Sequence, residues 1–281
     1  RPPPVGARAG RAAPVRLPRR IASESPMTSR VLPPDHPQRY QALIQIAEYL
    51  FQNDESAAIA AHEEEIDAAR RAVPDRLEQR GMRVLPWTLS GTNLKVSGVD
   101  SESPPAETIL LLGRGTQEPV ALMEALSIRL EAARDLQLER ILTWVDCERY
   151  DKSADAKRWY ECCFHFSDLV ILDRFKNLPV SWLKELRNEF KTKGYPCILT
   201  NTRKERLQDL HVVIDNQVRR ISQAFDFSDQ SDGIPVEVAI TSDFEDEEED
   251  DSLESTPAEP YFERTPDGRR SKPVPDLGPH H

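Results

Sequence analysis

The chain has little of what disulfide-bonded, secreted and membrane proteins depend on. It holds 4 Cys in 281 residues, and none of them belongs to a C-x-x-C pair. Adjacent cysteines rarely bridge without strain, and no framework of spacings is present, so we expect four reduced thiols. The basic first segment has no apolar run long enough for a signal-peptide core or a membrane span. These absences predict a cytoplasmic protein that binds no membrane.

Patterns for metal binding and nucleophilic catalysis are scarce as well. Cys162, Cys163 and His165 are close in sequence, but on a helix they point in different directions and no second pair lies nearby. Buried small apolar side chains explain these cysteines better than a zinc site does. No Ser, His and Asp set stands beside a nucleophile motif. The sequence therefore predicts no metal site and no catalytic residue.

Charge is concentrated at the two ends of the chain. Residues 1–26 hold six Arg and one Glu, a net charge of about +5. Because the sequence begins with Arg, we expect Met27 to be the initiator, with a transit peptide or a basic arm as the alternative. We predict that residues 1–37 form a disordered, basic and proline-rich leader.

Residues 226–281 form an acidic tail that we predict to be disordered. They hold 17 Asp and Glu against four Arg and Lys, about −13 in net charge. The run DFEDEEEDD at residues 243–251 buries no apolar surface and repels itself. The tail either keeps the protein soluble or binds a basic protein. Within it, PYFERTPDGRRSKPVP at residues 260–275 is the best candidate for a docking motif, because its Tyr261 and Phe262 are unusual in so polar a segment.

Between these ends, apolar periodicity predicts the first helices. Apolar residues at steps of three and four predict an amphipathic helix over residues 38–51. An Ala- and Glu-rich helix is expected over residues 55–72, followed by a connection with a short strand at residues 94–99. We therefore predict that residues 38–105 form a helical segment and an irregular connection before the core.

From residue 107 onward, short apolar runs alternate with helical patterns. The runs ETILLL, RILTWV, LVIL and YPCILT read as strands. Helices are expected after Pro119, around Trp159, between Ser181 and Gly194, and over residues 214–225. Apolar strands that alternate with helices imply a parallel sheet covered on both faces. The prediction for residues 106–225 is an α/β three-layer sandwich with a mostly parallel sheet of four to five strands.

A ligand of such a sheet would lie outside the carboxyl ends of its strands. In this chain those ends carry Arg114, Gly115, Asp146 and Asp173, which are our candidate ligand-binding residues. Carboxylates and an arginine at neighbouring strand ends suit a small acid or a phosphate. The alternative is that they are the caps and surface ion pairs that strand ends in α/β proteins commonly carry.

Three motifs follow one another in this core. Gly115 and Pro119 are four residues apart in GRGTQEP, the second strand ends in Val145, Asp146 and Cys147, and the third strand follows Phe166, Ser167 and Asp168. In order and spacing they resemble the CobW-like P-loop GTPases, a family of metal chaperones or insertases. The resemblance covers residues 107–176. It implies a P-loop NTPase-like fold with a nucleotide and magnesium at the strand ends.

The residues that this resemblance implies for chemistry are missing. No G-K-[ST] phosphate loop occurs in the chain, and SGTNLKVSG at residues 90–98 has the wrong spacing. Leu112 stands where an acid for magnesium is implied, and an alkyl chain cannot coordinate a hard cation. Lys176 stands where the guanine-reading Asp is implied, so an acceptor is replaced by a donor. The family's cysteine-rich metal motif is absent too.

These losses predict a degenerate GTPase-like domain, a pseudo-GTPase that needs no cofactor and acts through protein–protein interaction. The alternative is a CobW-like protein that still binds a nucleotide with magnesium, or a metal, through Arg114, Asp146 and Asp173. The expected partner is an unidentified protein, basic if the acidic tail engages it. Nucleic acid is not expected to bind, because the core is near neutral and the tail acidic.

Overall fold

The computed structural model describes residues 27–32, 37–99, 106–114, 118–133, 136–203, 206–215, 217–227 and 259–277. Within these ranges the strands are β1 (Met27–Leu32), β2 (Ala57–His62), β3 (Arg83–Ser90), β4 (Asn93–Val96), β5 (Thr108–Leu112), β6 (Leu136–Asp146), β7 (Leu169–Asp173), β8 (Ile198–Arg203) and β9 (Arg206–Leu207). The helices are α1 (Pro37–Gln52), α2 (Ile66–Ala72), α3 (Asp75–Glu78), α4 (Pro119–Ala132), α5 (Cys147–Lys152), α6 (Ala154–Phe166), α7 (Trp182–Lys193) and α8 (Leu210–Ile214), with a 3-10 turn η1 (Glu63–Glu65). No helix of the described ranges is long and apolar enough to cross a membrane.

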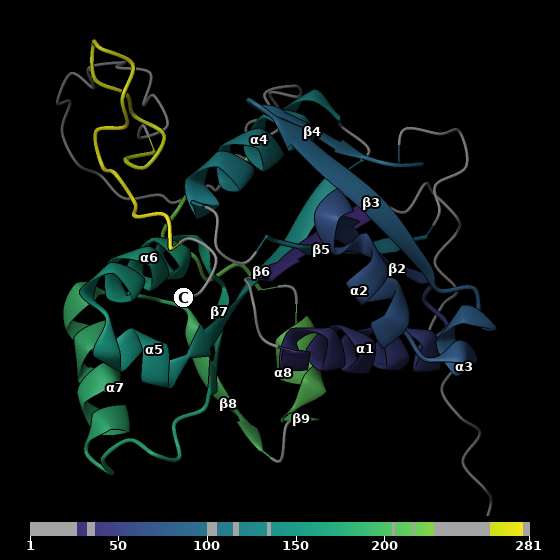
Figure 1. The fold of residues 1–281 in the computed structure, drawn as a ribbon, viewed down its shortest axis with the longest axis horizontal. Helices are drawn as coiled ribbons and strands as arrows, with labels where there is room; N and C mark the ends of the chain where they lie inside the picture. Colours follow the sequence, from purple (N-terminus) through teal and green to yellow (C-terminus); the bar gives the residue numbers. More distant parts are fainter. Residues whose placement is uncertain are drawn as a thin grey trace, which may run out of the picture.

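In the described part of the chain, the strands form one nine-stranded sheet in the order β4-β3-β2-β5-β1-β6-β7-β8-β9 (Figure 1). The interior pairs are parallel, and the β3–β4 and β8–β9 pairs at the two edges are antiparallel. Side chains alternate between the two faces of each strand. One face packs against α1, α2, α3 and α8, and the other against α4, α5, α6 and α7. The predicted α/β three-layer sandwich is confirmed, with a larger sheet than the expected four to five strands.

The elements from β5 to β8 follow the sequence pattern closely. Pro119 is the first residue of α4, where its missing N–H costs nothing. Gly194 ends α7 with a φ of 69°, a left-handed conformation that favours glycine. Ser181 occupies the N-cap position of α7, although its side chain makes no capping hydrogen bond.

The first strand lies inside the segment that we predicted to be a leader. β1 is a central strand, paired with β5 on one side and β6 on the other, and Leu32 is in register with Leu112. The prediction that residues 1–37 lie outside the fold is therefore wrong for this strand. Its six residues are too few to show a period, and its pairing partners are far along the chain. Residues 1–26 lie outside the described ranges, so the expected initiator Met27 stays a prediction.

The segment predicted as a second helix, residues 55–72, starts as a strand instead. AAIAAH forms β2, which is buried along its whole length between β3 and β5, and the helix α2 begins only at Ile66. Alanine has a high helix propensity, but its small side chain also fits a strand covered on both faces, and tertiary burial decides. Residues 38–105 thus contribute three strands to the sandwich, and the expected strand at residues 94–99 is β4.

The predicted last helix, residues 214–225, is mostly absent. Helix α8 ends at Ile214, and residues 217–227 are irregular. The backbone N–H of Arg219 donates to the Asp168 carboxylate, and those of Ile221 and Ser222 donate to the carbonyl of His165. These tertiary bonds replace the helical bonds that the apolar spacing predicted.

The last part of the predicted disordered tail is also ordered. Residues 259–277, yellow in Figure 1, pack on the helical layer, and Tyr261 is only 5% exposed. The prediction is wrong for this segment because its aromatic side chains bury enough apolar surface to dock. The acidic run at residues 243–251 lies outside the described ranges.

Candidate functional site

A phosphate loop of a P-loop protein joins a strand to the start of a helix. In this sheet the corresponding place is between the central strand β1 and helix α1. The four residues that join them are Pro33, Pro34, Asp35 and His36. Such a loop holds phosphates through successive backbone N–H groups and a lysine, and proline has no N–H. The residues of this segment therefore do not fit the phosphates of a nucleoside triphosphate. We missed this place from the sequence because we expected the fold to begin at residue 38.

The end of β5 is closed by apolar packing. Leu112, at the position where the resemblance implies an acid, is fully buried. Its carbonyl oxygen accepts a hydrogen bond of 2.9 Å from the indole N–H of Trp87. Arg114 forms an ion pair with Glu64, which follows the end of β2. Gly115 lies outside the described residues. At the implied magnesium position itself, Leu112 offers no carboxylate to the ion.

Asp146, at the end of β6, is held by two partners within the chain. Its Oδ1 accepts the backbone N–H of Arg149 at 3.1 Å, which caps helix α5, and its Oδ2 accepts from Arg174 Nη1 at 2.8 Å. Arg174 also donates to Glu148 at 3.3 Å, and the other oxygen of Glu148 accepts from Asn177 at 2.6 Å. Both carboxylates at this strand end therefore pair with the same arginine, Arg174, and each has a second hydrogen-bond donor within the chain.

Asp173 ends β7 and points into the protein. It is 5% exposed, and its Oδ1 accepts from the Thr202 hydroxyl of β8 at 2.6 Å. Asp146 and Asp173 are register partners across the β6–β7 pair, so the structure brings these two candidates together. Arg114 lies on the other side of β1 and pairs with Glu64 instead. The ligand-binding role of Arg114, Gly115, Asp146 and Asp173 stays a prediction.

The F-S-D motif has a structural explanation that needs no nucleotide. Asp168 is fully buried and accepts the backbone N–H groups of Ile141 at 2.8 Å and Arg219 at 2.7 Å. Its carboxylate also forms an ion pair of 3.1 Å with Arg220, whose side chain is 2% exposed. This aspartate ties β6 and β7 to residues 217–227.

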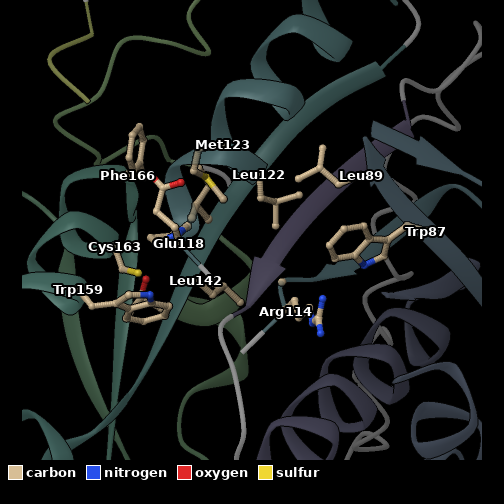
Figure 2. Close-up of a pocket in the computed structure, with 14 residues that line it drawn as sticks. Trp87, Leu89, Arg114, Glu118, Leu122, Met123, Leu142, Trp159, Cys163 and Phe166 are labelled. Atoms are coloured by element: carbon tan, nitrogen blue, oxygen red, sulfur yellow. The ribbon is translucent and has the colours of Figure 1, made fainter. Parts of the chain in front are cut away.

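A small cavity lies between the sheet and helices α4 and α6. Its volume is about 40 Å³. Figure 2 shows mostly apolar side chains around it, together with the charged side chains of Arg114 and Glu118. Pockets that hold small molecules measure roughly 300 to 1,000 Å³, whereas this cavity has room for a few water molecules at most. Burial raises the pKa of Glu118, against the opposing effect of Arg270.

The four cysteines are buried free thiols. Burial raises the pKa of Cys162 and Cys163 well above the ordinary value, and that of Cys197 to about 12. The thiolate is the form that binds metals and attacks substrates, and burial disfavours it here. Across the described ranges, no three His, Cys, Asp or Glu side chains are grouped so as to hold a metal ion.

Comparison with known proteins gives a weak signal. No family model and no curated protein matches the chain. Among solved structures, the zinc-bound YjiA GTPase from E. coli is similar at 11% identity, with a TM-score of 0.41 over 68% of this chain and 61% of that one. The signal recognition particle 54 kDa protein from Aeropyrum pernix K1, in complex with GDP, is similar at 10% identity, with a TM-score of 0.38 over 68% of this chain and 45% of that one. The chain thus spans less than two thirds of either protein, and likenesses at these scores decide neither ligand nor activity.

Proposed function

We propose that this chain is a degenerate P-loop GTPase-like domain that acts by binding another protein and does not turn over a nucleotide. The observation that carries the proposal is the mutual pairing of polar side chains at the carboxyl edge of the sheet. Asp146 pairs with Arg174, Asp173 with Thr202, and Arg114 with Glu64. The groups that would contact a ligand already satisfy one another.

Energetics supports the proposal. A ligand at this edge would have to break internal contacts, such as the hydrogen bond that the buried Asp173 accepts from Thr202, and each such loss costs free energy. The sequence between β1 and α1 offers little to repay that cost, since two of its four residues are prolines without an N–H and none is a lysine. Leu112, at the magnesium position, adds no attraction for the cation.

The second candidate function is nucleotide or metal binding through Arg114, Asp146 and Asp173. It draws on their positions at the carboxyl ends of β5, β6 and β7, where ligands of α/β sheets bind. Under this alternative the internal pairs would open when the ligand enters.

Calorimetric and thermal-shift titrations of the full chain with GTP and ATP, each with Mg²⁺, separate the two candidates. We expect no saturable heat and no change in Tm at millimolar nucleotide. A ligand present at 100 times its Kd would add about 2.7 kcal/mol of stability, which such a titration detects. Saturable binding that weakens in both Arg114→Ala and Asp146→Ala would establish the alternative and overturn our proposal.

A further inference from the structure

Residues 259–277 have the features of a bound peptide, and we call them the C-terminal strap. Their backbone–backbone hydrogen bonds join strap residues to one another, with a turn at residues 265–268 and a bridge between Arg264 and Arg270. None of the nine strands of the described sheet includes them. The strap is held on the core by side chains, so it can leave without breaking a strand or a helix.

The first anchor of the strap is Glu259. One of its carboxylate oxygens lies at hydrogen-bond distance from His165 Nε2, 2.8 Å away. The other accepts a hydrogen bond from the Ser222 hydroxyl at 2.5 Å. The side chains of His165 and Glu259 are 11% and 6% exposed. Burial raises the pKa of Glu259, but the hydrogen bonds of His165 and Ser222 outweigh burial and lower it. The charged form of Glu259 is therefore the one that docks.

The second anchor is the aromatic pair. The ring of Tyr261 lies 5.0 Å from that of His165 and 5.7 Å from that of Phe166, measured between centroids. Phe262 stacks on Phe166 at 5.8 Å. Lys272 of the strap also contacts Tyr261, with its Nζ 3.9 Å from the ring centroid. Aromatic side chains packed in this way are typical anchors of protein interfaces.

The third anchor is a pair of arginines on acidic side chains of α4 and its N-terminal flank. Arg264 and Arg270 both donate to Glu124, at 2.9 and 2.6 Å. Arg270 Nε also lies 3.1 Å from Glu118. Arginine–carboxylate pairs with more than one contact give a surface both affinity and geometric selectivity. At this third anchor the core side is acidic and the strap side is basic, the reverse of the first anchor, where Glu259 of the strap contacts His165.

The length of the connecting chain makes the strap a tethered ligand. The side chains of Ser222 and Glu259 are in contact, and 36 residues separate them in the sequence. A short tether of this kind holds its ligand at an effective concentration of order millimolar. A strap of even modest intrinsic affinity would then occupy its surface most of the time, and a competitor must match that effective concentration.

We propose that α4, α6 and residues 220–226 form a peptide-binding surface, and that the strap occupies it in place of a segment of a partner protein. The segment that fits carries an acidic residue two positions before a Tyr-Phe pair and two arginines further on, as Glu259, Tyr261, Phe262, Arg264 and Arg270 do. The inference names the partner chemistry for the protein binding proposed above and rests on that proposal, but its test involves no nucleotide.

The test uses the full chain with a weakened strap, Tyr261→Ala, Phe262→Ala and Arg270→Glu together. The probe is a fluorescent synthetic peptide of residues 259–277, followed by anisotropy. We expect saturable micromolar binding to this variant and at least about tenfold weaker binding to the wild type, where the tethered strap competes. A matched peptide with Arg264→Glu and Arg270→Glu should not bind. Adding Glu124→Arg to the variant should abolish binding of the native peptide and restore binding of the charge-reversed one.

A second measurement tests the inference even if the triple variant does not fold. A protease site inserted between residues 240 and 241 allows a chain with the unchanged strap sequence to be cut. After the cut, the strap should dissociate on dilution and rebind saturably. Absence of peptide binding to a variant with a wild-type circular dichroism spectrum would overturn the inference, as would a strap that never leaves the cut protein. A wild-type dimer that Arg270→Glu dissociates would overturn it too, since a second copy would then be the occupant. Nucleotide binding, in contrast, would contradict only the proposed loss of GTPase chemistry.

Discussion

The carboxyl edge of the sheet and the surface under the C-terminal strap are both rich in charge, but their pairs connect different things. At the edge, Arg174 with Asp146 and Thr202 with Asp173 join neighbouring strand ends that are 28 and 29 residues apart. Under the strap, Arg270 with Glu124 and His165 with Glu259 join residues 146 and 94 apart. Pairs of the first kind are part of the folded sandwich. Pairs of the second kind can separate while the sandwich stays folded.

The largest effect is expected from a pair that belongs wholly to the core. Asp168→Ala leaves Arg220 buried without its carboxylate and removes the acceptor of two backbone N–H groups. Breaking a buried ion pair costs about 3 to 5 kcal/mol. Urea unfolding measures this loss. The control is Asp226→Ala, because Asp226 pairs with the same arginine but is 51% exposed, and it should cost less than about 1 kcal/mol. Equal losses in the two variants would contradict this ranking.

The edge pair inside the sheet should come next. Asp173→Ala and Thr202→Val each remove one partner of the 2.6 Å hydrogen bond between two buried side chains. Each change should lower the free energy of unfolding by about 1 to 3 kcal/mol. In a double-mutant cycle the two losses should be strongly non-additive. Additive losses would contradict this coupling.

A strap pair should affect attachment more than global stability. Arg270→Glu breaks its contacts with Glu118 and Glu124, and we expect it to make residues 259–277 sensitive to protease. The free energy of unfolding of the sandwich should change by less than about 1 kcal/mol, since the strap opens before the core does. Arg269→Glu is the matched control, because Arg269 is 87% exposed and should leave the strap protected. A large loss of global stability in Arg270→Glu would make the strap an integral part of the fold.

Acid should release the strap through Glu259. Because the pKa of this carboxyl is lowered in the folded state, its contribution is fully present above the ordinary value of 4.5 and is lost as pH falls through the lower value. Protease sensitivity of the strap, measured between pH 3 and 6 with an acid-tolerant protease, should therefore rise below about pH 4.5. Glu118 has the opposite sign, since its raised pKa gives a contribution that is lost as pH rises. Glu259→Gln should remove most of the rise at low pH, and an unchanged profile would assign it to another group.

The smallest effect is expected at Arg114. Its partner Glu64 is 60% exposed, and surface ion pairs contribute about 0 to 1 kcal/mol. Arg114→Ala should therefore leave Tm within a few degrees of the wild type in a thermal melt. A drop as large as that of Asp173→Ala would mean that Arg114 supports the edge in a way that its ion pair does not explain.

The sequence predicts this molecule well where its signals are local. Strands β5 and β7 are continuous apolar runs, and helices α4 and α7 have apolar residues at helical spacing. Pro119 and Gly194 mark the start of α4 and the end of α7. Strands β1, β2 and β3 were missed. β1 has only six residues, β2 is rich in alanine and β3 contains a proline, so each is recognised by its partner strands rather than by its own pattern. The sequence placed polar residues at the carboxyl edge of the sheet but could not predict which of them form pairs. Strand register and side-chain direction decide which side chains come into contact.

The strap also shows where prediction from the sequence stops, because only one half of its interface carried a signal. The Tyr261–Phe262 pair in a polar tail was a usable signal of docking, and the structure places that motif on this chain's own core. Its receptor residues Glu118, Glu124 and His165 gave no comparable signal, because acids and histidines on helices are common. Only the three-dimensional arrangement joins them to arginines and a glutamate some hundred residues away.

Native-state hydrogen exchange of the wild-type chain tests the difference between the two regions most directly. The N–H groups of Thr265 and Ser271 are bonded only within the strap, whereas those of Arg149 and Arg219 donate to Asp146 and Asp168 of the sandwich. An isolated hairpin turn is barely stable in water, so a released strap exchanges quickly. We predict that the strap amides exchange through an opening whose free energy is much lower than that of global unfolding. The amides bonded to Asp146 and Asp168 should have much higher opening free energies than the strap amides. Equal opening free energies in the two regions would contradict the account, because the strap would then be an inseparable part of the fold.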